Sequence, residues 1–191
     1  MKVILLNGSP HINGCTCTAL TEVARALEDS GIEAQIIKID TDSAVGCRGC
    51  FACRKLGRCI VDDQVNRLAD LLESADGMIL ASPVYFAAPN AGFLAVLDRL
   101  YAAHGHKLRY KPCGCIVSAR RAGTTAALDA LNKYPLVCEQ PVVASSYWCM
   151  VHGNTPEEVR SDEEGLQIAR RLGLNMAWMV KALQGSRPPE A

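Results

Sequence analysis

The sequence alternates between short apolar runs and longer segments with helical periodicity, and this alternation is the strongest constraint on its fold. The predicted strands cover residues 2–7, 34–39, 77–82, 113–118 and 141–145, and the predicted helices cover 16–30, 63–74, 91–103, 124–134 and 162–183. Such alternation indicates a parallel sheet with helices on both faces. We therefore expect an α/β three-layer sandwich with a five-stranded parallel sheet in the order 2-1-3-4-5, whose ligand binds at the carboxyl ends of the strands.

Length and charge narrow the class of protein further. The 191 residues fit a single domain, 1–191, with a cysteine-rich insertion at about 43–62. Lys plus Arg and Asp plus Glu each number 20, so there is no global electrostatic reason to expect nucleic acid or a membrane as partner. The first strand begins after one Lys without a signal-peptide pattern, and no apolar run approaches the roughly 20 residues of a membrane span. We expect a cytoplasmic protein in which only the final SRPPEA is loosely held.

The first predicted strand leads into a loop, NGSPHINGCT, that is typical of an anion-binding turn. The chain turns at Gly8 and enters the first helix after Gly14, where backbone N–H groups lack partners and the helix dipole is positive. Polar side chains around this turn are Ser9, Asn13, Thr16 and Thr18. The loop lacks G-x-x-x-x-G-K-[ST] and G-x-G-x-x-G, so it suits a terminal monophosphate such as that of FMN. The alternative is an ordinary strand-to-helix turn without a ligand.

A second loop should meet the first at the same edge of the sheet. After the third strand, the segment SPVYF (82–86) combines a rigid turn at Pro83 with the aromatic residues Tyr85 and Phe86. This combination suits a planar ring bound by backbone N–H groups and aromatic surface. The alternative is that Tyr85 and Phe86 are core residues at a strand end.

The third loop at this edge is SARRAGTT (118–125). Its Arg120 and Arg121 suit negative charge on a reduced flavin ring or on a nucleotide phosphate, or they form a solvated pair. Cys115 and Arg121 also match the Cys-x5-Arg spacing of low-molecular-weight phosphatases. That cysteine lies inside a predicted strand rather than in a loop, which argues against the phosphatase interpretation.

The most specific motif is GCRGCFACRKLGRC, which spaces Cys47, Cys50, Cys53 and Cys59 as Cys-x2-Cys-x2-Cys-x5-Cys. The chain has ten cysteines, and in a reducing compartment clustered cysteines indicate metal or redox chemistry more often than disulfides. Four thiolates are the usual ligands of a [4Fe–4S] cluster, and a three-cysteine hook with a nearby fourth resembles ferredoxin usage. The alternatives are zinc, which usually takes two separated cysteine pairs, and a loop without metal.

The other cysteines and histidines carry weaker signals. Cys113 and Cys115 share one face of a strand and are expected in the core. Cys15 lies at a helix N-terminus, where a thiol is either reactive or a packing residue. We expect His104 and His106 to lie in a polar, solvated loop.

The combination of motifs resembles the NADPH-dependent FMN reductase family of the flavodoxin-like superfamily, and more narrowly the iron–sulfur flavoproteins. The matching stretches are NGSPHINGCT, the four-cysteine loop ending in CIVDD, ASPVYF followed by FLAVLDRL, SARRAGTT, YWCMVHG and GLQIARRLGLNMAW. They span nearly the whole chain. Where the family usually has Asn and a basic residue, this chain has Cys15 and His11, so two phosphate contacts should differ.

The resemblance implies FMN bound by three loops, with no catalytic side chain because the flavin carries the chemistry. The implied FMN contacts are Ser9, His11, Asn13, Gly14, Cys15 and Thr16 in the first loop, Pro83, Val84, Tyr85 and Phe86 in the second, and Ser118, Arg120, Arg121 and Gly123 in the third. It also implies a homodimer or homotetramer with flavins near subunit contacts.

Two main functions are therefore expected. The first is an FMN-dependent oxidoreductase that passes electrons from NAD(P)H through bound flavin to an unidentified acceptor. The alternative is an iron–sulfur flavoprotein electron carrier that takes single electrons from a ferredoxin through a [4Fe–4S] cluster. A third interpretation is a flavin-binding module without turnover.

Overall fold

The computed structural model describes residues 1–186 and 188, so most of the SRPPEA tail lies outside the described residues. The strands are β1 (Lys2–Asn7), β2 (Glu33–Lys38), β3 (Gly77–Tyr85), β4 (Ala88–Pro89), β5 (Cys113–Ala119), β6 (Val142–Val143) and β7 (Met150–His152). The helices are α1 (Cys15–Asp29), α2 (Cys53–Leu56), α3 (Gln64–Glu73), α4 (Ala91–Leu108), α5 (Thr124–Val137), α6 (Pro156–Arg160) and α7 (Glu163–Ala182).

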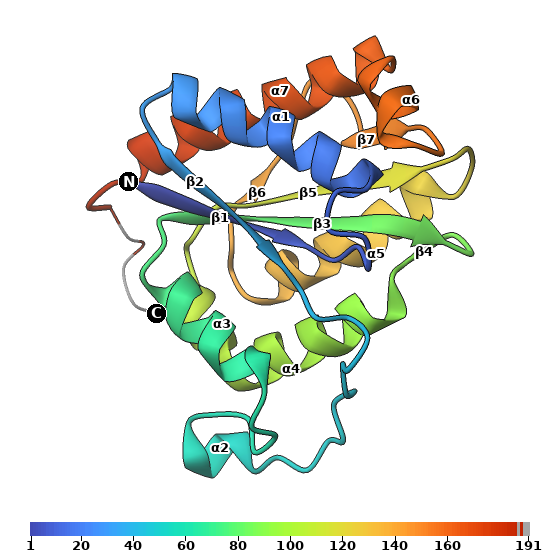
Figure 1. Cartoon of the computed structure of the whole chain (residues 1–191). Helices are drawn as coiled ribbons and strands as arrows, with labels where there is room; N and C mark the ends of the chain where they lie inside the picture. The colour runs from blue at the N-terminus through green and yellow to red at the C-terminus, as the bar shows by residue number, and fades with distance from the viewer. Residues whose placement is uncertain (187, 189–191) are drawn as a thin grey trace.

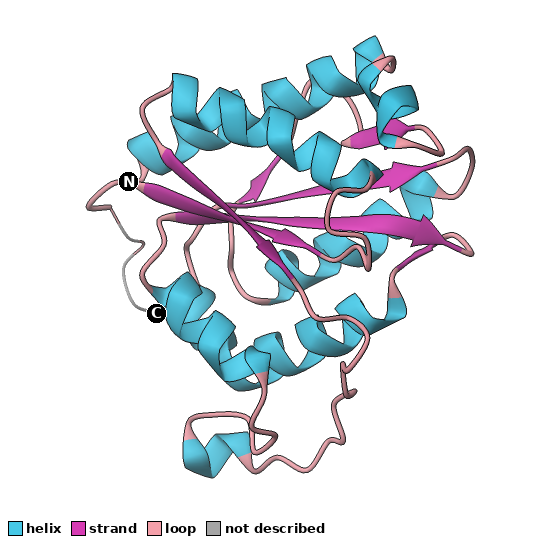
Figure 2. Cartoon of the chain, viewed as in Figure 1, coloured by secondary structure: helices cyan, strands magenta, loops and turns pink. Residues whose placement is uncertain are grey.

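The sheet lies between two layers of helices, which confirms the expected α/β sandwich (Figures 1 and 2). Helices α1 and α7 pack against each other on one face, and α3, α4 and α5 cover the other. The strand interiors are continuous apolar runs, as expected for parallel strands covered on both faces. In β1, residues Val3, Ile4, Leu5 and Leu6 have no exposed surface. No helix among the described residues is long and apolar enough to cross a bilayer.

The strand count differs from the prediction, because within residues 1–186 the sheet has seven strands, five of which follow the order β2-β1-β3-β5-β6. The two additional strands, β4 and β7, are short. β4 forms a two-residue antiparallel pair with β3, and β7 pairs with β5 beyond β6. The predicted strand 141–145 shrinks to Val142–Val143, since the following segment leaves the sheet and Ser145 donates a hydrogen bond to the Ile168 carbonyl at 2.7 Å. Two short strands therefore take the place of one long strand beside β5: β6 pairs with the beginning of β5, and β7 pairs with its end.

Several element boundaries also differ from the prediction. β3 continues through Pro83 to Tyr85, so these residues lie in a strand and not in a loop, and β5 ends at Ala119, one residue beyond the predicted end at Ser118. Helix α4 continues to Leu108. His104 is therefore buried within this helix instead of solvated, whereas His106 is exposed as expected. Cys113 and Cys115 are buried in β5, as predicted.

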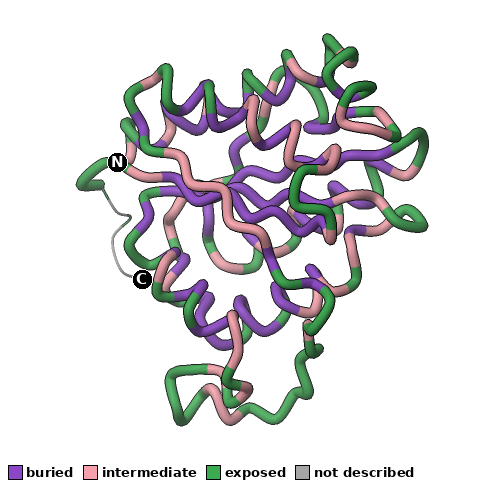
Figure 3. Tube along the Cα trace, in the orientation of Figure 1, coloured by how far each residue is buried: buried purple, intermediate pink, exposed green. Residues whose placement is uncertain are grey.

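The cysteine-rich insertion lies between β2 and α3 and extends away from the sheet, beyond α3 and α4 (Figure 1). Most of its trace is exposed in Figure 3, in contrast to the buried strands and helix faces. Its only regular structure among the described residues is α2, a single turn that ends at Gly57 in the left-handed conformation. Little apolar burial therefore holds this segment, and its shape depends on polar contacts to α3 and α4.

The close packing of α1 on α7 predicts the effect of adding a methyl group at Gly173. A Cβ there would lie 2.6 Å from the Val23 carbonyl oxygen and 2.7 Å from the Ala26 Cβ, neither of which is a flexible group. Overpacking costs about 1–3 kcal/mol, which should exceed the gain in helix propensity of about 1 kcal/mol. We expect Gly173→Ala to lower the urea midpoint, while the exposed Gln167→Ala in the same helix leaves it unchanged. An equal or higher midpoint for Gly173→Ala would contradict this packing.

Candidate functional site

Loops from three neighbouring strands meet at the carboxyl edge of the sheet. The Gly8 N–H donates to the Ala81 carbonyl at 2.8 Å, which joins the β1–α1 loop to β3. Gly123 lies so close to the β3–β4 turn that a Cβ there would be 2.8 Å from the Ala87 Cα. The structure therefore brings together the three loops that the sequence predicted as one site.

The β1–α1 loop is built by its own polar groups. The Ser9 N–H donates to Asn7 Oδ1 at 3.0 Å, and Ser9 Oγ accepts from the His11 N–H at 3.1 Å. Ser9 is buried, so it shapes the loop, whereas His11 and Asn13 are exposed at its surface. Asn7 Nδ2 is buried and has no hydrogen-bond partner, which leaves a donor at the base of the loop.

Thr16 connects the first loop to the third. Its Oγ1 lies 2.8 Å from Ser118 Oγ, and both residues are buried. Thr16 stands in the first turn of α1 and Ser118 near the end of β5, so this hydrogen bond fixes the start of the helix against the sheet. Thr16 and Ser118 are thus structural residues of the edge, and their hydroxyls already have a partner.

The helices differ at their N-termini, and α1 and α5 at this edge share the absence of a side-chain cap with the one-turn α2 of the insertion. α3, α4, α6 and α7 are each capped by a side-chain oxygen, from Asp63, Asn90, Thr155 and Asp162 respectively. α1 and α5 begin at Gly14 and Gly123, which carry no cap side chain. Their first N–H groups therefore need another acceptor, and an anion such as a phosphate satisfies them.

The β3–β4 turn presents aromatic surface beside these groups. Phe86 is fully exposed, and Phe86 and Ala87 both have positive φ angles, 51° and 60°. Such angles are uncommon for residues other than glycine and are concentrated at ligand sites. Burial, followed by the neighbouring Cys15 thiol, raises the pKa of Tyr85. The thiol of the first loop therefore acts electrostatically on the tyrosine of the second.

A fourth loop completes this edge. Cys15 Sγ donates to the Gly153 carbonyl, which follows β7, at 3.6 Å. Burial is the main cause of the raised pKa of Cys15, so this thiol has little tendency to ionise at neutral pH. Arg120 and Arg121 are exposed in the β5–α5 loop. These residues can hold an anionic, ring-containing ligand across the loops, and the uncapped helices, the free Asn7 amide and the aromatic turn fit FMN.

The four motif cysteines line a cavity of about 280 Å³ between the insertion and α4. Its other lining residues include Phe51, Ile60, Val61, Arg99 and Ala102. Cys47 and Cys50 are exposed, and Cys53 Sγ donates to the Ala102 carbonyl at 3.7 Å. Within the described residues, no three His, Cys, Asp or Glu side chains are close enough together to hold a metal ion. Four cysteine thiolates are chemically suited to bind an iron–sulfur cluster. The insertion must nevertheless close around the cavity before the four sulfur atoms come near enough to bind one cluster.

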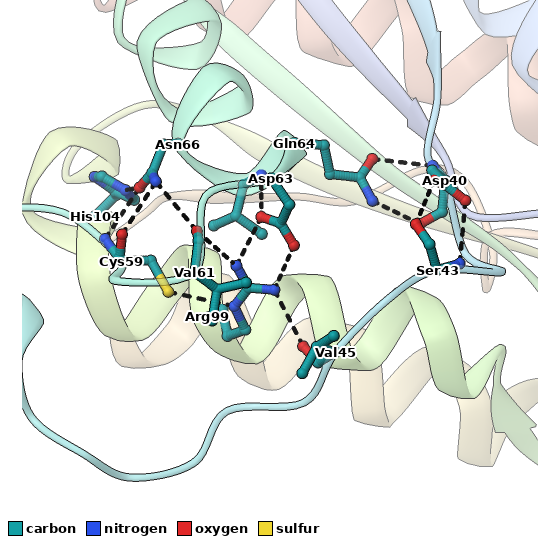
Figure 4. Close-up of polar contacts among 11 residues, drawn as sticks. Asp40, Ser43, Val45, Cys59, Val61, Asp63, Gln64, Asn66, Arg99 and His104 are labelled. Atoms are coloured by element: carbon teal, nitrogen blue, oxygen red, sulfur yellow. Dashed lines mark hydrogen bonds and ion pairs between the residues drawn. The ribbon is translucent and has the colours of Figure 1, made fainter.

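Arg99 of α4 is the buried residue that connects the two ends of the insertion (Figure 4). It forms a bidentate ion pair with Asp63 at 2.6 and 2.7 Å. It also donates to the carbonyls of Val45 and Val61 at 3.2 and 3.3 Å, on either side of the motif. Burial acts to raise the pKa of Asp63, but hydrogen bonds from Arg99 and from the Val65 N–H outweigh it and lower this pKa.

The comparisons with known proteins agree with this arrangement. Residues 1–155 match the family model described as NADPH-dependent FMN reductase. The chain belongs to this family. An iron-sulfur flavoprotein of Methanocaldococcus jannaschii is 31% identical over 96% of this chain and 100% of its own, and one of Archaeoglobus fulgidus is 34% identical over 93% of this chain and 79% of its own. A solved flavodoxin, WrbA-like protein from Agrobacterium tumefaciens shares the fold, with a TM-score of 0.69, 16% identity and coverage of 95% of this chain and 98% of its own.

Sequence reasoning missed the residues that hold the insertion, namely Arg99, Asp63 and Asn66, the last of which forms hydrogen bonds with the backbone of Cys59. A signal for Arg99 was present, because it lies at helical spacing between Val96 and Ala103 on the apolar face of α4. A buried arginine among apolar residues requires a partner, which predicts an ion pair or a ligand near it. The partner itself could not be identified, since Asp63 lies 36 positions away in sequence.

The Thr16–Ser118 hydrogen bond predicts a specific loss of stability. Thr16→Val keeps the side-chain shape and removes the hydroxyl, so Ser118 Oγ stays buried without this partner. We expect the free energy of unfolding in urea to fall by about 1–3 kcal/mol. Thr21→Val is the matched control in the same helix, because the Thr21 hydroxyl donates only to the Cys17 carbonyl one turn earlier. Equal stability of the two variants would contradict the structural role of Thr16.

Proposed function

We propose that this flavin-binding oxidoreductase is an electron-transfer protein that holds FMN at the carboxyl edge of the sheet and a [4Fe–4S] cluster in the cysteine cavity. When bound, FMN exchanges two electrons in single steps or together, and the cluster exchanges one. The observation that carries the proposal is that four cysteines line one cavity beside a buried guanidinium. The names of the relatives from M. jannaschii and A. fulgidus support it. Of the two main functions expected from the sequence, we thus favour the iron–sulfur electron carrier over the oxidoreductase that takes electrons from NAD(P)H.

In this proposal the chain contributes binding and orientation, and no side chain acts as an acid or base. The N–H groups that begin α1 and α5 would hold the FMN phosphate, together with Asn13 and His11 at the surface of the loop. The segment 83–86 would hold the ring, and Arg120 or Arg121 would stabilise negative charge on it. Cys47, Cys50, Cys53 and Cys59 would be the cluster ligands.

One helix connects the two proposed sites. Phe93, in the first turn of α4, packs against Gly8, since a Cβ on Gly8 would lie 2.3 Å from the Phe93 ring. Arg99 and Ala102 of the same helix line the cysteine cavity. The rise from Phe93 to Arg99 is about 9 Å. A rigid helix that contacts both sites supports a function in which electrons move between them.

The second candidate function is NAD(P)H-dependent flavin reduction, which the description of the matching family favours. The exposed Arg120 and Arg121 would then bind the phosphate of the nicotinamide donor. Assembly as a homodimer or homotetramer, use of a ferredoxin partner and a cytoplasmic location remain predictions of the same proposal.

The two functions differ in their electron donor. We expect reduced ferredoxin to bleach the flavin of the anaerobic protein and NAD(P)H to do so at least about tenfold more slowly, because a donor of single electrons enters through the cluster. Cys53→Ala should retain flavin and lose reduction by ferredoxin, whereas Cys138→Ala, outside the motif, should behave as wild type. Rapid reduction by NAD(P)H that is unaffected by Cys53→Ala would favour the second function.

A further inference from the structure

Cys59 differs from the other three motif cysteines because its backbone is held on both sides. Asn66 Oδ1 accepts from the Cys59 N–H at 3.0 Å, and Asn66 Nδ2 donates to the Cys59 carbonyl at 3.1 Å. His104 Nε2 lies 2.9 Å from the same Asn66 oxygen (Figure 4). Asn66 and His104 are both buried. The main chain of Cys59 is therefore fixed to α3 and α4 before any metal binds.

The Cys59 sulfur is fixed as well, by Arg99. Arg99 Nε donates to Cys59 Sγ at 3.3 Å. The other four N–H groups of the guanidinium go to Asp63 and to the carbonyls of Val45 and Val61. All five donors of the fork are thus used, and Arg99 is 2% exposed. Because the guanidinium is planar, rigid and shielded from water, its Nε–H group stays directed at the Cys59 sulfur.

We propose that Arg99 is a positioning residue that presets Cys59 as the first cluster ligand and raises the reduction potential of the cluster through its N–H···S hydrogen bond. This inference rests on the proposed function, since it requires a cluster in the cysteine cavity. Reduction of a [4Fe–4S] cluster adds one electron and breaks no bond, and it increases the negative charge on the sulfurs. A donor on a ligand sulfur stabilises the more negative state and therefore raises the potential.

The preset ligand also explains how an exposed segment can build a four-ligand site. Cys47 and Cys50 are exposed, and the described residues contain no converged set of three ligands. Cys59 and the carbonyls of Val45 and Val61 define fixed points on either side of the other three cysteines. The segment between these points can close around the cluster once Cys59 has bound iron.

The test compares Arg99→Lys with Arg58→Lys in anaerobically reconstituted protein. Lysine keeps the charge at position 99 but cannot bind Asp63 with two donors and reach Cys59 as well. Arg58 is next to Cys59, exposed, and paired with Asp62 at 3.0 Å, so it is a matched control. At the midpoint potential of the wild-type cluster, we expect Arg99→Lys to lower the ratio of reduced to oxidised cluster by about tenfold. This change corresponds to a potential lower by about 59 mV for one electron. Arg58→Lys should leave the potential unchanged.

A second measurement leaves position 99 unchanged, in case Arg99→Lys does not fold. In protein labelled with 15N-arginine, pulsed EPR of the reduced cluster should detect a weak nitrogen coupling that survives Arg48→Lys and Arg54→Lys, because these two arginines also line the cavity. Equal potentials for wild type and a folded Arg99→Lys, or no 15N coupling that survives these two substitutions, would overturn this inference alone. Wild-type protein that takes up no iron and sulfide would instead overturn the proposed cluster, so the two failures are distinguishable.

Discussion

The cysteine-rich insertion depends on one physical constraint, the buried charge of Arg99. A guanidinium that is 2% exposed is costly unless it is fully paired, and here Asp63 and backbone carbonyls from both sides of the cysteine motif supply the partners. The same contacts close the ends of an insertion that has little apolar burial of its own. Removing either partner of the ion pair would leave an uncompensated charge, so the insertion depends on Arg99 of α4 for its attachment to the domain.

The loops at the carboxyl edge of the sheet are held by a different kind of interaction. They are held by neutral hydrogen bonds such as Thr16 to Ser118, and two of the helices that start there, α1 and α5, lack a cap side chain. The backbone donors at the edge are therefore left for a ligand, whereas the donors in the insertion are used to fix the chain. Helix α4 contacts both regions through Phe93 and Arg99, so the two proposed sites share one rigid support.

The sequence predicted the layers of this fold well because long apolar and amphipathic segments carry their own periodicity. The prediction from the sequence failed where contacts between residues distant in the chain determine the structure. The division between β6 and β7 depends on Ser145 binding a carbonyl of α7, and β4 depends on a turn with positive φ at Phe86 and Ala87. His104 was expected in a solvated loop, whereas the continuation of α4 buries it and Asn66 supplies its hydrogen-bond partner. The cysteine spacing identified the motif, but the role of Arg99 depends on contacts distant in sequence.

The central claim is that one chain holds a flavin and a cluster at two separate sites. The most direct measurement is the content of flavin, iron and acid-labile sulfide in wild-type protein purified without oxygen, together with its visible spectrum. The account predicts a brown protein with about one flavin, four irons and four sulfides per chain. A yellow protein with flavin and no iron would contradict the cluster site, and a colourless protein that cannot take up FMN would contradict the interpretation of the sheet edge.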